Sequence, residues 1–199
     1  MQPPFKINIC GIHELSGLAG TPFSHVLSIL DPGHPPPPAL GRISAQKWLE
    51  LRFDDVIDDL PGKVPPGPAM VAALLEFGDD MQELGWGEPH LLVHCHAGVS
   101  RSTACTAVLL AQFCPEWTGD EIFATLLHAR PWLWPNLRII ELGDAALGRG
   151  GELVEAAGRL YARQIESNLD LIEYFQGLGR NRELAAGFAA GALADGEPY

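Results

Sequence analysis

Residues 94–102, HCHAGVSRS, combine three residue types that can act together on an anion. Arg101 offers a planar guanidinium that matches two oxygens of one phosphate group. Gly98 is free to adopt the positive φ that a tight loop around an anion needs. Cys95, facing into such a loop, would have its thiolate stabilised by the same positive field and could attack phosphorus. The spacing therefore predicts a loop that binds a phosphoryl group in front of a nucleophile.

The elements on either side of this stretch would position it for that chemistry. Residues 89–95 are a short continuous apolar run, typical of a central strand that is covered on both faces. Residues 102–113 are nearly all apolar and predict a buried helix. Ligands in α/β folds bind beyond the carboxyl ends of strands, and the first N–H groups of a helix favour an anion. The loop is therefore expected at a strand-to-helix junction suited to phosphate.

The rest of the chain supplies the pattern of an α/β protein. Short apolar runs bounded by glycine and proline predict three further strands, at 5–15, 25–31 and 48–55. Apolar residues spaced three to four apart predict further helices, at 68–84, 118–130, 136–147 and 151–176. The proline-rich stretches at 33–41 and 61–68 are expected to be loops. We expect a central, mostly parallel sheet of about four to five strands with helices on both faces.

The length and composition limit the domain count and the partners. The 199 residues suit one ordinary domain, expected at 1–178, followed by an Ala- and Gly-rich tail at 179–199 with a frayed end. With 47% hydrophobic and 19% charged residues the chain is expected to fold as a globular protein. A net charge of -12 argues against nucleic acid and anionic membranes as partners, although a local pocket can still hold one phosphate.

No targeting or membrane segment is expected from the sequence. No stretch approaches about 18 uninterrupted apolar residues, and the first residues lack the apolar region of a signal peptide. The four cysteines, at 10, 95, 105 and 114, are too scattered for a disulfide framework. Reduced thiols in the cytoplasm are the simplest interpretation.

The stretch HCHAGVSRS resembles the active-site loop of the cysteine-dependent protein tyrosine phosphatases. It is most similar to the dual-specificity-like branch, in which HC-x-A-G-x-S-R-S is typical. The resemblance extends to HVLSILD before the loop and RPWLWPN after it, and covers roughly residues 5–147. Some bacterial tyrosine phosphatases share the LRFDD turn as well.

The resemblance implies a role for each residue of the loop. Cys95 would form a phosphocysteine intermediate, Arg101 would bind phosphate and stabilise the transition state, and Ser102 would help the thiolate depart. The loop amides would supply the remaining donors, from His96, Ala97, Gly98, Val99, Ser100 and Arg101. His94 would orient the loop from behind. The family's chemistry needs no cofactor and no metal.

The family also uses an upstream aspartate as general acid, and LRFDDVIDD offers four. Alternation of inward residues through Leu51 and Phe53 puts Asp55 on the same side, just past the strand end. Asp55 is therefore the candidate acid and then base for the attacking water, with Asp54 as the alternative. The interval from Asp55 to Cys95 is longer than usual in the family, which we attribute to an insertion at 61–68.

Two other functions fit the same loop. One is a catalytically idle module that reads phosphorylated partners, and the other is a thiol or sulfur-transfer protein. For the hydrolase, the substrate would be a phosphorylated protein or a small phosphomonoester. The variable loop positions carry no lysine, which makes an inositol phospholipid a poorer candidate. Phosphotyrosine and phosphoserine or phosphothreonine are not distinguished by the sequence, and neither is the oligomeric state.

Overall fold

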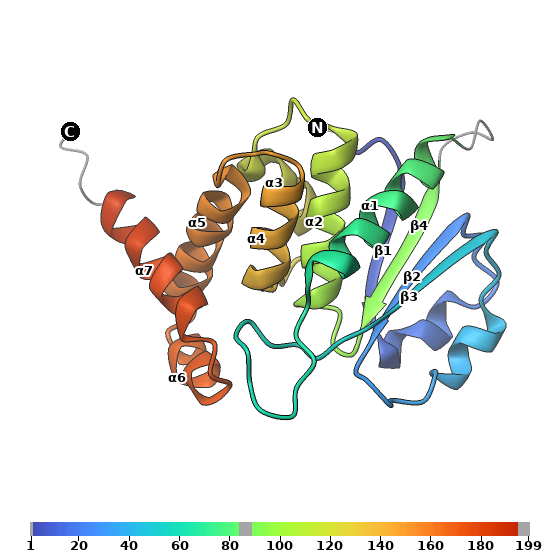
Figure 1. Cartoon of the computed structure of the whole chain (residues 1–199), viewed down its shortest axis with the longest axis horizontal. Helices are drawn as coiled ribbons and strands as arrows, with labels where there is room; N and C mark the ends of the chain where they lie inside the picture. Colours follow the sequence, from blue (N-terminus) through green and yellow to red (C-terminus); the bar gives the residue numbers. More distant parts are fainter. Residues whose placement is uncertain (1, 84–88, 195–199) are drawn as a thin grey trace.

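Four parallel strands carry the loop that holds Cys95 (Figure 1). The computed structural model describes residues 2–83 and 89–194. The strands are β1 (Lys6–Gly11), β2 (His25–Leu30), β3 (Lys47–Arg52) and β4 (His90–Cys95). Their spatial order is β1-β4-β2-β3, and every pair is parallel. The candidate nucleophile thus ends one of the two inner strands, as the apolar run before it predicted.

Helices cover both faces of this sheet, but unequally (Figure 1). The α-helices lie on one side of the sheet. They are α1 (Pro68–Glu83), α2 (Arg101–Phe113), α3 (Gly119–Ala129), α4 (Leu137–Ala146), α5 (Glu152–Ser167), α6 (Asp170–Gly177) and α7 (Asn181–Ala194). Two short 3-10 helices, η1 (Ile12–Leu18) and η2 (Pro38–Arg42), cover the other face. The predicted α/β fold class is confirmed.

The sheet separates a large apolar core from a small one. The α-helical face of the strands, including Leu27, Ile29 and Val93, packs in one cluster with the residues of α1 to α5. The opposite face, including Val26 and Leu92, packs against the 3-10 helices. Burial on both faces explains why the inner strands read as continuous apolar runs.

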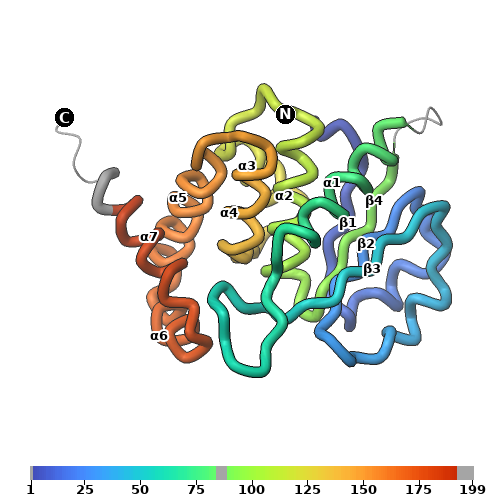
Figure 2. Tube along the Cα trace, in the orientation of Figure 1, coloured from blue at the N-terminus to red at the C-terminus, as the bar shows by residue number. Residues whose placement is uncertain are grey.

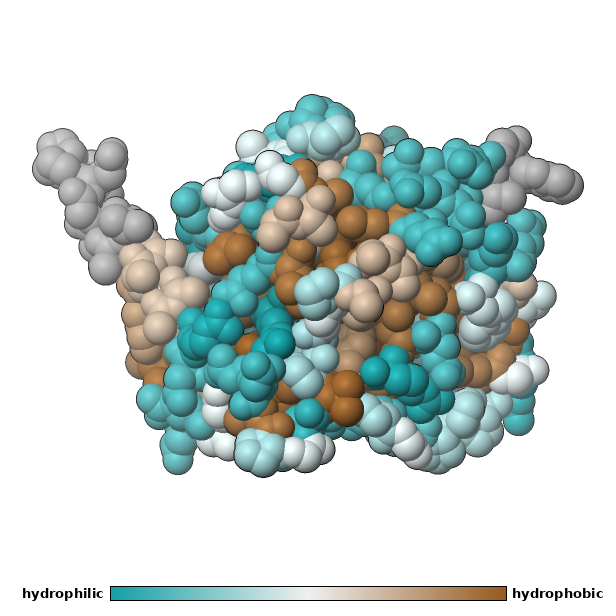
Figure 3. Space-filling model, in the orientation of Figure 1, coloured by the Kyte–Doolittle hydropathy of each residue, from teal (hydrophilic) through white to brown (hydrophobic). Residues whose placement is uncertain are grey.

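Beyond the helices that cover the sheet lies a further helical layer. Helix α5 packs on α3 and α4, and α7 packs on α5 on the side away from the sheet, as the trace in Figure 2 shows. Figure 3 shows apolar residues gathered over the middle of this face, across α1 and α4, with hydrophilic residues around them. None of the helices in the described part of the chain is long and apolar enough to cross a membrane.

Local signals placed most helix ends correctly. Thr118 and Glu121 form a capping box at the start of α3: Glu121 N donates to Thr118 Oγ1 at 3.3 Å, and Thr118 N donates to Glu121 Oε2 at 2.8 Å. The helix expected at 68–84 ends at Glu83, and Leu84 lies outside the described residues. The loop expected at 33–41 runs into the short helix η2.

Two expected elements differ from the structure. The strand expected at 5–15 ends at Gly11, because residues 12–18 turn into η1. The single helix expected at 151–176 was wrong: the chain breaks at Asn168, whose backbone is extended with φ -155°. Asn168 Oδ1 accepts from Asp170 N, which starts α6, and Leu169 is 68% exposed instead of buried. The predicted domain limit at 178 stays a prediction, and α7 forms within the stretch that follows it.

Candidate active site

The loop between β4 and α2 is held from outside through its carbonyl oxygens. Four of these oxygens accept hydrogen bonds from the surrounding chain: His96 O from Ile12 N, Ala97 O from Arg130 Nη2, Val99 O from Trp134 N and Ser100 O from Asn136 N, at 3.0 to 3.3 Å. In a trans peptide the N–H points opposite to the C=O. The loop amides therefore face the interior, where an anion would lie.

Gly98 occupies a position that only glycine can take in this loop. Its φ is +71°, in the left-handed region. A Cβ at this position would lie 2.4 Å from the carbonyl carbon of Cys10 and 2.6 Å from Gly11 N. Both are backbone atoms of β1 or its end, so they cannot give way. The loop is thus packed directly against the neighbouring strand.

Cys95 lies at the bottom of the loop with two hydrogen-bonding partners. Its side chain is buried, and Gly98 N donates to Sγ at 3.2 Å. Ser102 Oγ, on the first turn of α2, lies 3.2 Å from the same sulfur. A backbone amide and a hydroxyl therefore converge on one sulfur at the N-terminus of α2.

Arg101 is buried at the start of α2 and reaches across the loop. Its Nη1 donates to Asp31 Oδ1 at 2.6 Å and to Phe53 O at 2.7 Å. Its Nε lies 3.9 Å from Asp55 Oδ2. The guanidinium is thereby fixed between the ends of β2 and β3, beside the loop whose amides point inward.

Asp55 lies just past β3 with its carboxylate held beside the loop. Oδ1 accepts from Ser100 Oγ at 2.8 Å, Asn136 Nδ2 at 2.9 Å and Arg180 Nη1 at 3.2 Å. The other oxygen, Oδ2, faces Arg101. The structure therefore brings together Cys95, Arg101, Ser102 and Asp55, the four residues that the sequence selected.

Asp54 points into the following loop instead. Its Oδ1 accepts from Lys63 Nζ at 2.9 Å, and its Oδ2 accepts from Val64 N at 2.8 Å. The backbone hydrogen bond from Val64, helped by Lys63, holds the pKa of Asp54 below its ordinary value. The carboxylate thus closes the proline-rich loop that the sequence predicted as an insertion at 61–68, of which Pro68 already begins α1.

The two histidines beside Cys95 lie in different surroundings. His94 is fully buried within the sheet, beside Ser28 of β2, and burial lowers its pKa to about 4. It is therefore neutral near pH 7. His96 lies at the rim, with its ring 4.6 Å from that of His34 and its Nε2 3.4 Å from Asp31 N. Burial also lowers the pKa of His96.

The other three cysteines are buried, and burial is the largest influence on their thiols. Burial raises the pKa of Cys10 to about 12, and it raises those of Cys105 and Cys114 as well. All three stay protonated thiols near pH 7. Within the described ranges, no three His, Cys, Asp or Glu side chains are grouped closely enough to hold a metal ion.

Sequence reasoning missed two residues that contact the site and one that supports them. Asp31 follows β2 and binds Arg101. Arg180, just before α7, binds Asp55, and Glu183 of α7 binds Arg180. Asp31 ends an apolar run beside the site, which was a usable signal. Arg180 lies in a stretch of weak periodicity, where nothing local pointed to the loop.

The fold is similar to that of solved phosphatase structures. It matches human DUSP28 with a TM-score of 0.50, at 16% identity, over 72% of this chain and 95% of that chain. It matches Tk-PTP in its active form with a TM-score of 0.50, at 17% identity, over 72% of this chain and 92% of that chain. No family model matches the sequence, and neither does any curated protein. The chain therefore shares the fold of these solved phosphatases, which agrees with the resemblance at the level of the fold.

Proposed function

We propose that this protein is a phosphomonoester hydrolase of the protein tyrosine or dual-specificity type, acting through a phosphocysteine on Cys95. The observation that carries the proposal is the loop itself. Its carbonyls are bonded outward, its amides face inward, and the sulfur of Cys95 accepts from Gly98 N at its base. This arrangement can neutralise the charge of a phosphoryl group while a nucleophile attacks it.

The reaction would proceed in two steps. Cys95 Sγ attacks phosphorus while the bond from phosphorus to the ester oxygen breaks, and Asp55 gives a proton to the departing oxygen. Water, losing a proton to Asp55, then attacks phosphorus and breaks the S–P bond, releasing inorganic phosphate. Arg101 and the loop amides bind the phosphoryl oxygens in both steps, and Ser102 donates to the sulfur as it leaves.

The substrate is a phosphorylated protein or a small phosphomonoester. A reducing compartment such as the cytoplasm suits this chemistry, because the reaction needs Cys95 as a free thiolate and all four cysteines are unpaired. Arg101 and the amides supply the positive field, so the reaction requires no metal.

Hydrolysis of p-nitrophenyl phosphate by wild type and Cys95→Ser, in EDTA and reductant, tests the proposal. Activity that survives the chelator and vanishes in the variant supports it. A wild-type protein that binds phosphopeptides without turnover across pH 5–8 would instead be a phosphate reader. Transfer of sulfur from thiosulfate to cyanide with real turnover would favour the sulfur-transfer alternative.

A further inference from the structure

Arg180 connects the C-terminal helix to both sides of the candidate site. It is buried just before α7, and its Nη1 donates to Asp55 Oδ1 at 3.2 Å. Its Nη2 donates to Ser100 Oγ at 3.0 Å. One guanidinium therefore bridges the aspartate past β3 and the phosphate loop. Neither the loop motif nor the chemistry proposed above accounts for this contact.

Glu183 fixes the guanidinium from the opposite side. Its Oε1 accepts from Arg180 Nη2 at 2.6 Å and its Oε2 accepts from Arg180 Nε at 2.9 Å, a two-point contact. The same carboxylate accepts from Leu137 N at 3.0 Å and from Trp134 Nε1 at 2.5 Å. Glu183 is fully buried, and four donors satisfy its charge.

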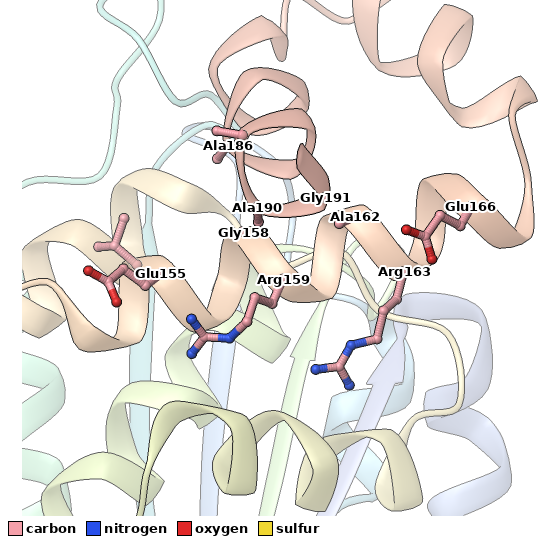
Figure 4. A pocket seen from close by; sticks show the side chains of 11 residues that line it. Glu155, Gly158, Arg159, Ala162, Arg163, Glu166, Ala186, Ala190 and Gly191 are labelled. Atoms are coloured by element: carbon pink, nitrogen blue, oxygen red, sulfur yellow. The ribbon is translucent and has the colours of Figure 1, made fainter. Parts of the chain in front are cut away.

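Close packing of α7 on α5 holds this pair in position. Figure 4 shows Ala186, Ala190 and Gly191 of α7 facing Gly158 and Ala162 of α5, while Arg159 and Arg163 of α5 point away from α7. A Cβ on Gly158 would lie 3.1 Å from Ala186 O. The small residues let the helices approach closely, which fixes the start of α7 against the site.

Trp134 also helps to hold the Arg180–Glu183 ion pair in position. Its ring stacks on Phe175 of α6 at 3.9 Å and on Tyr161 of α5 at 4.6 Å. Because its Nε1 binds Glu183 and its backbone N binds Val99 O, the same residue contacts the ion pair and the phosphate loop. The position of Arg180 is thus determined by several rigid neighbours.

The two carboxylate oxygens of Asp55 have different partners, which suits them to different roles. Oδ1 already accepts from three donors, including Arg180, whereas Oδ2 lies 3.9 Å from Arg101 Nε, the group proposed to bind phosphate. Burial would lower the pKa of Arg180, but the Glu183 and Asp55 carboxylates outweigh burial and raise it, so Arg180 keeps its charge. An acid must have a free oxygen for its proton, and here that oxygen is Oδ2.

We propose that Arg180 is a positioning residue, which holds Asp55 so that Oδ2 exchanges the proton with the leaving oxygen. This inference rests on the proposed function. The proton on Oδ2 passes to the ester oxygen as its bond to phosphorus breaks and the S–P bond forms. Arg180 itself touches no reacting atom. Its effect must therefore depend on how much help the leaving group needs.

A series of aryl phosphates measures that dependence directly. A phenol that is a poor leaving group needs protonation, whereas a strongly acidic fluorinated phenol departs without it. The variant replaces the buried pair together, as Arg180→Met with Glu183→Gln, because losing one partner alone would leave a buried charge unpaired. Arg182→Gln is the matched control: it removes a neighbouring arginine of α7 that contacts Asp58 and Glu141.

We expect the double variant to lose about tenfold or more in kcat/KM on phenyl phosphate and less than about threefold on the fluorinated ester. Asp55→Asn should show the same pattern, and the double variant in that background should lose nothing further. Arg182→Gln should keep the wild-type dependence on the leaving group.

The outcomes separate this inference from the proposed function. Equal losses on all esters, or a further loss in the Asp55→Asn background, would mean that Arg180 only stabilises the fold. Either result would overturn the positioning role of Arg180 and leave the proposed function unaffected. Wild-type inactivity on every ester would overturn the proposed function, and the assignment with it. Circular dichroism and melting of each variant verify that the folded proteins are being compared.

Discussion

Arg101 Nη1 donates to Asp31 Oδ1 at 2.6 Å, so the cation proposed to bind phosphate already binds a carboxylate. Asp31 is partly exposed and also lies beside His96. A phosphate dianion entering the loop would meet this negative charge next to the guanidinium. Asp31 therefore opposes anion binding in the free protein while it fixes the direction of Arg101.

Asp31→Asn should strengthen the binding of inorganic phosphate or vanadate. Two unit charges about 6 Å apart at an effective dielectric near 40 repel by about 1.4 kcal/mol, which corresponds to roughly tenfold in the inhibition constant. The inhibition constant is measured from competitive inhibition of p-nitrophenyl phosphate hydrolysis. His96→Gln is the control for an effect that acts through the His96 ring beside Asp31. Weaker inhibition would show that orientation of Arg101 matters more than repulsion.

Asp55→Asn should lower turnover of phenyl phosphate by about 10²- to 10⁴-fold, as expected when a general acid is lost. Asp54→Asn is the matched neighbour. Because its carboxylate binds Lys63 and Val64 N, its loss should loosen the 61–67 loop and cost less than about tenfold in rate. Steady-state kinetics of both variants check this, and the reverse order would move the acid to Asp54.

Stability should fall below pH 6.5 because His94 is buried. Its pKa is lowered from 6.5 to about 4 in the folded state, so between these values the unfolded chain binds a proton that the native protein does not. Stability is therefore lost as the pH falls, by about 2 kcal/mol between pH 7.5 and pH 5. His94→Gln should remove that part of the slope in urea unfolding. If His94→Gln kept the wild-type dependence of stability on pH, this prediction would be wrong.

The strands and the loop were predictable because their signals are local. Each strand is an apolar run bounded by breakers, and the loop motif places its nucleophile, glycine and arginine within seven residues, Cys95 to Arg101. Strand alternation through Phe53 was also enough to select Asp55 beside the loop. In each case the residues that determine the structure are neighbours in the chain.

The rest depended on contacts between distant parts of the chain. The break at Asn168 was missed because α6 has a buried face of its own, so apolar spacing continues past the end of α5. Arg180 and Glu183 are charged residues in an Ala- and Gly-rich stretch, and their burial depends on Asp55 and Trp134. No local pattern encodes a partner more than a hundred residues away.

The contact between Arg180 and Asp55 joins residues 125 apart in the sequence, whereas Cys95 and Ser102 are seven apart. Closing the longer loop costs more chain entropy and must wait until α5 offers a surface for α7. We therefore expect the contact between Arg180 and Asp55 to form late in folding, after the contacts of α5. We expect a refolding chain to recover phosphate binding before it recovers full turnover, and the delay between the two measures the docking of α7 on α5.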